Sequence, residues 1–546
     1  MLSLNIDDRP VDLPNDFSFT MNLKSPVFSE IGSYSYPFRI PATPKNVITM
    51  GYRHRVENIG DPYMTQEGAF FWNGLQLFKG TVKVKTSNSK YYEGTIFESE
   101  GDFFYSRQRL TLQQFDFGTM EFANPAARLA YINSCANVRY PDAVLAFPQI
   151  KNLSYWEELP ENWILQSCNF YTSAGIARYI PSSTTRTIIV PMLYLRYILK
   201  TIFTKLNYVF DDSFFASDSD YNSLALFNLV DCNTASTGYF KYDENKLFLN
   251  YHVPIISLNN FLSGLESFFN IRFFINNSTR TIRLLSLDAI VKSIACTDLT
   301  KSIISFSTEL EDKIKGWDVK MTIDSDDLVA AQTAIVEKDA IDHIKDSVQS
   351  VALLPPWPSS EVVDMRFVHD EGIYYRMWQD FTWHPAPSDI GLVSLFTEVL
   401  YKDKDQSIST PFSTLFSDLT TGEGIIGNAM INWKAVTPKL FFMKYQLTGG
   451  SLGQPRDTAN SSTATKNLFY NGDNSLFKQN FLSFLDFRLS TKLVINVAQL
   501  GFNDLRDFDF SKKYMFRGVK YLVKSIQVTL KKDKIMPAML ECYACE

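Results

Sequence analysis

The clearest candidate for redox or metal chemistry is the pair Cys542 and Cys545 near the end of the sequence. A zinc site would need a second pair of ligands, and a redox motif would need to open a helix. Neither feature accompanies the pair. The six cysteines lie at positions 135, 168, 232, 296, 542 and 545. They are too sparse for a disulfide framework, so we expect a protein made in a reducing cytoplasm.

A second pattern, Gly422-Glu-Gly424-Ile-Ile-Gly427, matches the GxGxxG spacing of dinucleotide-binding loops. That motif follows a buried strand, and an acidic residue further on completes the βαβ unit. The preceding residues 414–421 do not have the pattern of a buried strand, and no acidic residue is suitably placed. We therefore interpret the stretch as a flexible loop.

Asp218, Asp220 and Asn222 have the spacing that begins a calcium-binding loop. However, Ser223 stands where that loop needs glycine, and Leu229 stands where it needs a bidentate glutamate. We therefore reject a calcium site at this position.

Glu157 and Glu158 could supply a glycosidase carboxylate, but adjacent side chains point to different faces and nothing marks a partner. A solvated pair is the simpler interpretation. The sequence contains no HExxH, GxSxG or Walker motif, and its five histidines form no catalytic signature with cysteine. We assign no catalytic, cofactor-binding or metal-binding residue, and we expect that the protein is not an enzyme.

The composition favours a β-rich protein with large contacts between subunits. The 546 residues are 45% hydrophobic and 21% charged, which is enough for two to four domains with their own cores. Aromatic residues make up 14%, and these favour strands and subunit interfaces. The net charge of -6 argues against a nucleic-acid-binding surface, which would be basic.

The sequence also predicts neither an export signal nor a membrane span. Residues 1–10 contain no basic region followed by an apolar run. No segment reaches eighteen uninterrupted apolar residues.

Residues 257–285 predict the most definite unit, a capped helix followed by a hairpin. Ser257 can accept a hydrogen bond from the first turn, and apolar residues recur on one helical face. This face consists of Leu258, Phe261, Leu262, Leu265, Phe268 and Phe269. After Asn270 the period changes to two on both sides of a turn at 276–279, which predicts strand, turn and strand.

Two more helices are predicted from the same spacing. One has Pro191 at its first position, ends at 207–208, and buries Leu195, Ile198, Leu199, Ile202, Phe203 and Leu206. The other carries Phe477, Phe481, Phe484, Leu485 and Leu489. Short alternating runs between 11 and 150, and again between 494 and 543, predict strands.

We therefore predict an α+β, β-rich, multidomain chain, with β-barrel or sandwich domains and a few amphipathic helices packed on antiparallel sheets. The predicted segments are a barrel or sandwich (1–150), an irregular connection (151–190), a helix-plus-hairpin domain (191–300), an inserted β-rich domain with mobile loops (301–465), and a C-terminal helix with strands able to complete an earlier barrel (466–546).

Several stretches carry a resemblance to a known family. They are Ser35-Tyr-Pro-Phe-Arg-Ile-Pro-Ala-Thr-Pro-Lys-Asn46, Asn73-Gly-Leu-Gln-Leu-Phe-Lys-Gly80, and residues 190–208, 257–285 and 514–526. With these stretches the sequence resembles the tail hub, or baseplate hub, proteins of tailed bacteriophages, especially those of phages and prophages of gut Bacteroidetes. Residues 300–465 contribute almost nothing to the resemblance.

The resemblance implies a virion structural protein, assembled in the host cytoplasm, whose barrels form a homo-oligomeric ring in the tail. A trimer is the favoured symmetry. The ring would join the tail tube and adaptor to the tip or spike and leave a channel for DNA. Barrels in that family are often discontinuous in sequence. A neutral or acidic channel wall suits this role, because a basic wall would bind DNA by releasing counterions.

Two other classes stay open. A carbohydrate-binding or glycan-degrading protein would also be β-rich and aromatic, but should show a carboxylate pair and, if it acts outside the cell, a signal peptide. A soluble assembly scaffold is the other alternative, and a monomer in solution would favour it.

Overall fold

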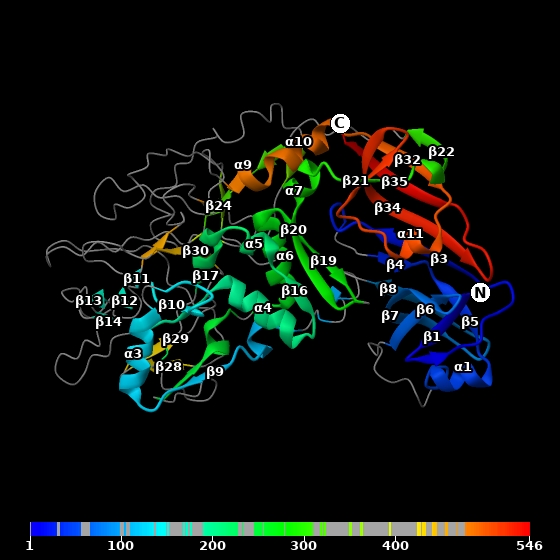
Figure 1. Ribbon diagram of the computed structural model, residues 1–546. Helices are drawn as coiled ribbons and strands as arrows, with labels where there is room; N and C mark the ends of the chain where they lie inside the picture. The colour runs from blue at the N-terminus through cyan, green and yellow to red at the C-terminus, as the bar shows by residue number, and fades with distance from the viewer. Residues whose placement is uncertain are drawn as a thin grey trace. The chain divides into compact units, whose positions relative to one another are not determined.

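A computed structural model describes residues 2–29, 33–55, 66–98, 110–135, 138–148, 189–227, 245–254, 256–277, 279–308 and 476–545, with isolated residues and short strands elsewhere (Figure 1). These residues form two compact units. Unit 1 comprises Met1–Gln108, Arg272–Ile314 and Ser483–Glu546, and unit 2 comprises Arg109–Ile271 and Lys315–Leu482. The β-rich α+β class is confirmed. The two units are defined only by which residues contact one another. They therefore do not test the five predicted segments, which stay a prediction.

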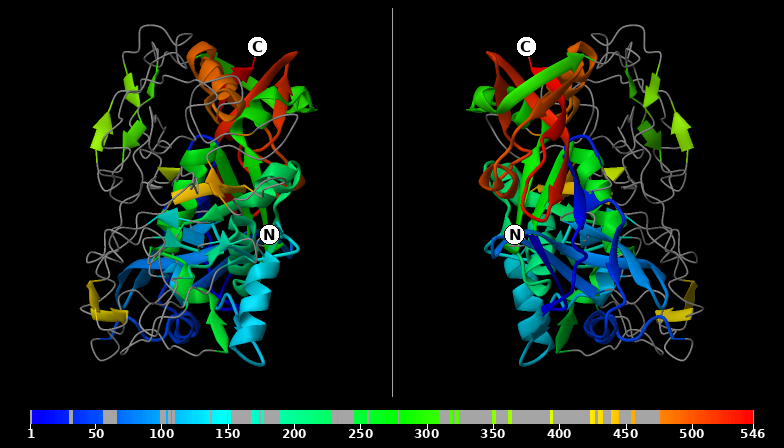
Figure 2. Two further views of the ribbon diagram at one scale, coloured as in Figure 1. Left: turned by 90° about the vertical axis from the view of Figure 1, so that its left-hand side faces the viewer. Right: turned by 90° about the vertical axis from the view of Figure 1, so that its right-hand side faces the viewer.

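Unit 1 contains one 14-stranded, mostly antiparallel sheet that draws on three separate parts of the chain. Its strands are β1 (Leu2–Ile6), β2 (Arg9–Pro10), β3 (Ser18–Lys24), β4 (Ser33–Ser35), β5 (Phe38–Pro41), β6 (Gln66–Trp72), β7 (Leu75–Ser87), β8 (Tyr91–Glu98), β21 (Cys296–Asp298), β22 (Ile303–Thr308), β32 (Leu493–Ala498), β33 (Lys513–Phe516), β34 (Val519–Lys531) and β35 (Ala538–Cys545). Figure 2 shows the blue N-terminal strands beside the red C-terminal ones.

The sheet curls back on itself in two places. Along the order β1-β6-β7-β8-β4-β3-β34 it returns to its start, because the amide of Leu2 donates to the carbonyl of Lys532, just after β34 (2.8 Å). The second curl is β33-β34-β35-β32, whose two edges are joined by residues 296–308. Within this segment β21 pairs in parallel with β33, and β22 pairs antiparallel with β32. We call residues 296–308 the strap.

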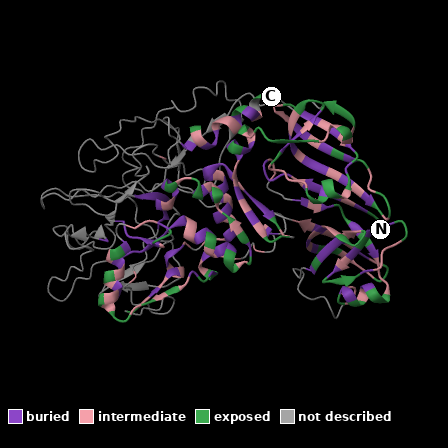
Figure 3. Ribbon diagram, in the orientation of Figure 1, coloured by how far each residue is buried: buried purple, intermediate pink, exposed green. Residues whose placement is uncertain are grey.

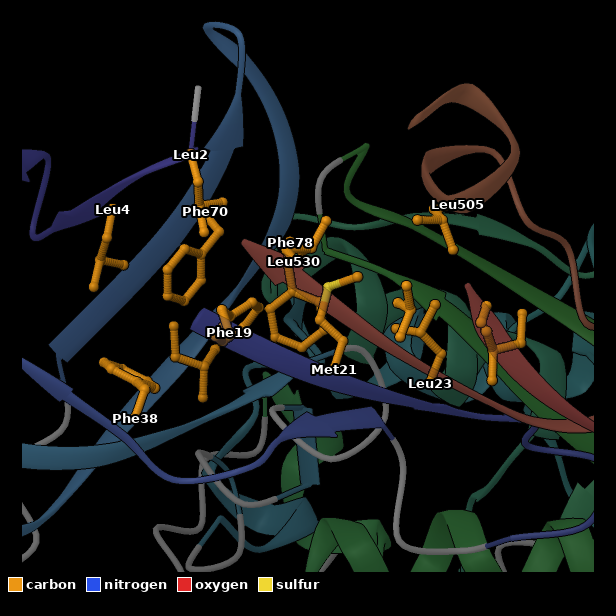
Figure 4. Close-up of a cluster of buried hydrophobic side chains, with 14 of the residues drawn as sticks. Leu2, Leu4, Phe19, Met21, Leu23, Phe38, Phe70, Phe78, Leu505 and Leu530 are labelled. Atoms are coloured by element: carbon orange, nitrogen blue, oxygen red, sulfur yellow. The ribbon is translucent and has the colours of Figure 1, made fainter. Parts of the chain in front are cut away.

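Phenylalanines fill the first curl (Figure 4). The ring centres of Phe19 and Phe70 lie 3.6 Å apart, and Phe38 and Phe78 pack edge-on against this pair. All four are buried, and Leu530 from the C-terminal part joins the same core. Each fully buried side chain of this size contributes about 1.5–3 kcal/mol, so the two ends of the chain stabilise each other.

Glycine permits the tight curvature of the first curl. Gly68 and Gly80 face each other as register partners on β6 and β7. A Cβ on Gly80 would lie 1.8 Å from the backbone oxygen of Phe97, so no side chain fits there. Glycine at a close backbone approach is a usual device for bending a sheet.

Short helices accompany the sheet of unit 1. They are α1 (Pro44–Thr49), α7 (Leu287–Lys292), α10 (Leu482–Ser490), which begins at the unit boundary, and α11 (Phe502–Arg506). Residues 44–46 were predicted as strand or loop, and this was wrong because Thr43 caps a helix with proline in its first turn. The third predicted helix is two helices, α9 (Leu476–Asn480) and α10.

The helix α6 (Leu258–Phe269) of unit 2 confirms the first predicted helix. The hydroxyl of Ser257 accepts from the amide of Asn260 (3.2 Å), and Asn270 ends the helix with φ 50°. All six residues of the predicted face are buried. The predicted strands that follow are confirmed as β19 (Ile271–Asn276) and β20 (Thr281–Ser286), and from Arg272 onward they belong to unit 1.

The helix α4 (Leu195–Lys205) confirms the second apolar stripe, with Leu206 only partly buried at its end. Its predicted start at Pro191 was wrong. Met192 and Leu193 form β15, which pairs with β10 (Leu145–Ala146), so the helix begins only after Tyr194.

Other elements of unit 2 are short. The helices are η2 (Leu112–Gln114), α3 (Pro125–Cys135), α5 (Ser213–Ala216), η5 (Ser219–Ser223) and η6 (Leu249–His252). The strands include β9 (Thr119–Glu121), β16 (Val209–Asp211), β17 (Leu224–Leu226), β18 (Lys246–Phe248), β28 (Glu423–Ile426), β29 (Ala429–Asn432), β30 (Lys439–Lys444) and β31 (Gln454–Arg456). Trp156, Trp163 and residues 365–378 lie outside the described residues.

We expect Gly80→Ala to destabilise the protein by about 3 kcal/mol, because the added methyl group forces β7 and β8 apart. Urea unfolding followed by tryptophan fluorescence measures this. Gly74→Asn is the matched control, since Gly74 has open space around it and a φ of 80° that asparagine tolerates. Equal stability of the two variants would contradict the role given to Gly80.

Candidate interaction surface

The structure separates the two cysteines of the CxxC pair. Cys542 and Cys545 lie on strand β35, where residues three apart point to opposite faces. Cys542 is fully buried, and burial raises the pKa of its thiol. The pair therefore does not form a shared ligand or redox site.

The glycine-rich stretch was predicted as a loop, and this was wrong for Glu423–Ile426. These residues form strand β28, in which Gly424 pairs with Ile431 of β29. A dinucleotide-binding motif instead leads into a helix. Gly422 and Gly427 lie outside the described residues.

Asp218 and Asp220 serve a short 3-10 helix. The Asp218 carboxylate accepts from the amide of Asp220 (2.9 Å) and lies 3.7 Å from Nζ of Lys466. Burial, and then the charge of Asp218, raise the pKa of Asp220. Among the described residues no group of three or more His, Cys, Asp or Glu side chains is placed to hold a metal ion. Glu157 and Glu158 fall outside them.

Exposed apolar side chains mark the second curl of unit 1. Nine large hydrophobic residues are exposed in the described part of the chain, and five of them lie in this curl or directly before the strap. They are Ile294 (84% exposed), Ile304 (55%), Phe306 (59%), Val519 (43%) and Met539 (37%). Single exposed apolar residues are ordinary, but a concentration on one substructure indicates a contact with another molecule.

Contacts connect the strap and the residues just before it to the hairpin of β33 and β34. The guanidinium of Arg517 lies 5.5 Å from the centre of the Phe306 ring. The backbone amide of Arg517 donates to Oγ1 of Thr300 (3.0 Å). Lys520 Nζ donates to the carbonyl of Ile294 (3.3 Å). We call Ile294, Ile304, Phe306, Arg517 and Val519 the strap surface. It combines apolar and cationic groups, the composition typical of protein interfaces.

Strand β22 is mostly exposed (Figure 3) and gives this surface an open edge among the described strands. It pairs with β32, and the described residues place no strand against its other edge. Its sequence Ile303-Ile-Ser-Phe-Ser-Thr308 contains no charge and no proline. By contrast β2, at the opposite end of the sheet, is two residues long and contains Pro10. An uncharged edge strand is a template for pairing with another chain.

The partly buried carboxylate of Asp509 positions β33, one of the strands that the strap joins. Although burial opposes its ionisation, hydrogen bonds from Ser511 and Arg283 hold the pKa of Asp509 below its usual value. Arg283 Nη2 donates to Asp509 Oδ1 (3.0 Å), and Ser511 Oγ donates to the same oxygen (2.6 Å). Tyr514 of β33 hydrogen-bonds the backbone of Asp509, and burial raises the pKa of Tyr514 to about 12.

No protein family and no curated protein matches the sequence. One solved structure similar to this chain is the 43 kDa tail protein of prophage MuSo2 from Shewanella oneidensis, with 6% identity, a TM-score of 0.34, and coverage of 99% of this chain and 96% of that chain. No argument about fold or function follows from a TM-score this low. None of the described helices is long and apolar enough to cross a membrane.

We expect Asp509→Asn to reduce stability at pH 7 by about 1.5–3 kcal/mol, the range for hydrogen bonds to a charged group. Because the folded pKa is lowered, this stabilisation is present above the unfolded pKa of about 4 and is lost as the pH falls further. The difference between the variants should therefore vanish in acid. Urea unfolding at several pH values measures it.

Asp507→Asn is the control for this experiment. Asp507 is exposed and pairs with Arg506 at the surface, so its replacement should change stability little at any pH. A loss for Asp509→Asn that does not depend on pH would contradict the role of the carboxylate charge.

Proposed function

We propose that this chain is a structural protein of a phage tail, and more narrowly a tail hub that acts without catalysis. Copies of the chain would form a ring between the tail tube or adaptor and the tip or spike. Its place would be the virion tail, after assembly in the host cytoplasm. The sequence resemblance to hub proteins is the starting point for this proposal.

One structural observation carries it. Unit 1 takes strands from both ends of the chain and from residues 296–308, and folds them into two curled sheets that share β34. The resemblance implies barrels that are discontinuous in sequence, and this arrangement supports that part of the proposal. An enzyme of the glycan-degrading class would instead need a carboxylate pair in a cleft.

The strap surface supports the oligomeric part of the proposal. In a monomer Phe306 is exposed and the described residues leave one edge of β22 unpaired, which favours aggregation. A closed ring of identical copies covers such a surface without forming fibres. Tail proteins above and below the ring would be the other partners.

The mass in solution tests the ring. By light scattering we expect a multiple of 62.5 kDa, with three copies favoured, and ring-shaped particles in negative-stain images. A protein that stays monomeric as its concentration is raised would contradict the hub and favour the scaffold.

Passage of DNA without binding is a second expectation. The net charge of -6 favours a channel wall on which lysine and arginine are few or paired with carboxylates. Filter binding of double-stranded DNA to the assembled protein at low salt should give no retention. Affinity that falls steeply with salt would instead indicate a DNA-packaging or capsid-interior role.

A further inference from the structure

The strap is held in place by backbone hydrogen bonds and hardly at all by burial. None of residues 292–308, all of which the structure describes, is buried. In the neighbouring strands, by contrast, Leu522, Ile526 and Leu540 are fully buried. Since buried apolar area supplies most local stability, the strap should open at a much lower free energy than β34 or β35.

The hydrogen bonds of the strap are those of an ordinary ladder. β22 pairs with β32 from Ile303 opposite Ala498 to Thr308 opposite Val494, with a bulge after Ile303. The amide of Leu299 donates to the carbonyl of Met515 (3.0 Å), and that of Gln499 donates to Ser302 (2.8 Å). Backbone groups on β32 would accept the same segment from a second copy equally well.

Removal of the strap would leave the core beneath it largely intact. The core side of β32 is built with β35, where Ala498 pairs with Ala538 and Val494 with Cys542, all of them buried. From the strap only Leu299 and Ile303 pack against this core, and both are partly buried.

We propose that the strap is exchanged between neighbouring copies, so that β22 of one copy pairs with β32 of the next. The occupant is a second copy because the structure shows that this sequence fits the β32 edge, and exchange of an identical element preserves every contact. The uncharged β22 meets no like charge on its neighbour. Repeated in one direction, the exchange links a closed ring, so this inference rests on the proposed function.

A disulfide placed across the β22–β32 pair tests the exchange. Ser305 and Val497 are register partners, and Ser305→Cys/Val497→Cys is made in a Cys296→Ser background to remove the exposed native thiol. The assembled protein is oxidised and run on a denaturing gel without reductant. We expect covalently linked copies in place of single chains.

The control pair lies in the body of the sheet. Thr20 and Thr529 are register partners on β3 and β34, with their hydroxyl oxygens 2.8 Å apart. Thr20→Cys/Thr529→Cys should give single chains only, because β34 is not exchanged. Hydrogen exchange is the second measurement, in which amides of residues 296–308 should exchange at least tenfold faster than those of β34.

The possible outcomes separate the two proposals. A ring by light scattering in which the engineered β22–β32 disulfide lies within single chains overturns the exchange and leaves the hub standing. Strap amides as protected as those of β34 also overturn the exchange. A monomer at every concentration overturns both.

Discussion

The pairing of β3 with β34 is the interaction on which unit 1 depends. It runs from Ser18 opposite Lys531 to Lys24 opposite Ser525, so each hydrogen bond joins residues about 500 positions apart in the sequence. Both curled sheets include β34, and the phenylalanine core receives side chains from both ends of the chain. Contacts of such long sequence separation form late, because loop-closure entropy must first be overcome.

This constraint explains how the chain is divided. It leaves unit 1 after Gln108, returns for Arg272–Ile314, and leaves again until Ser483. The outer segments must meet before either curl can close, whereas α6 and α4 in unit 2 are specified by residues close in sequence. Local order in unit 2 therefore does not have to await the pairing of the chain ends.

Local periodicity predicted the elements well where one face is buried. The stripe of α6, its serine cap and the hairpin after Asn270 were all visible in the sequence, because each follows from spacing within a few turns. The partner of a strand is not encoded in its alternation, so the pairing of β3 with β34 and the position of the strap were not predicted. The start of α4 was wrongly predicted at Pro191, because proline is compatible with an extended segment as well as with the first turn of a helix. The strap surface was also missed, since exposed apolar residues in a strand leave no periodic signal.

The contrast between the two ends of the sheet bears on why the strap surface exists. Proteins usually protect edge strands with charge, proline or short length, because an open edge invites aggregation. β2 has the short length and the proline, while β22 has six residues and neither protection. The guanidinium of Arg517, which lies 5.5 Å from the centre of the Phe306 ring, belongs to the neighbouring turn and not to β22 itself. Because β2 is protected, strand contacts between copies are favoured at the β22 end of the sheet over indiscriminate stacking at both ends. The proposed exchange of the strap takes place at this same end, and its repetition in one direction allows a ring to close.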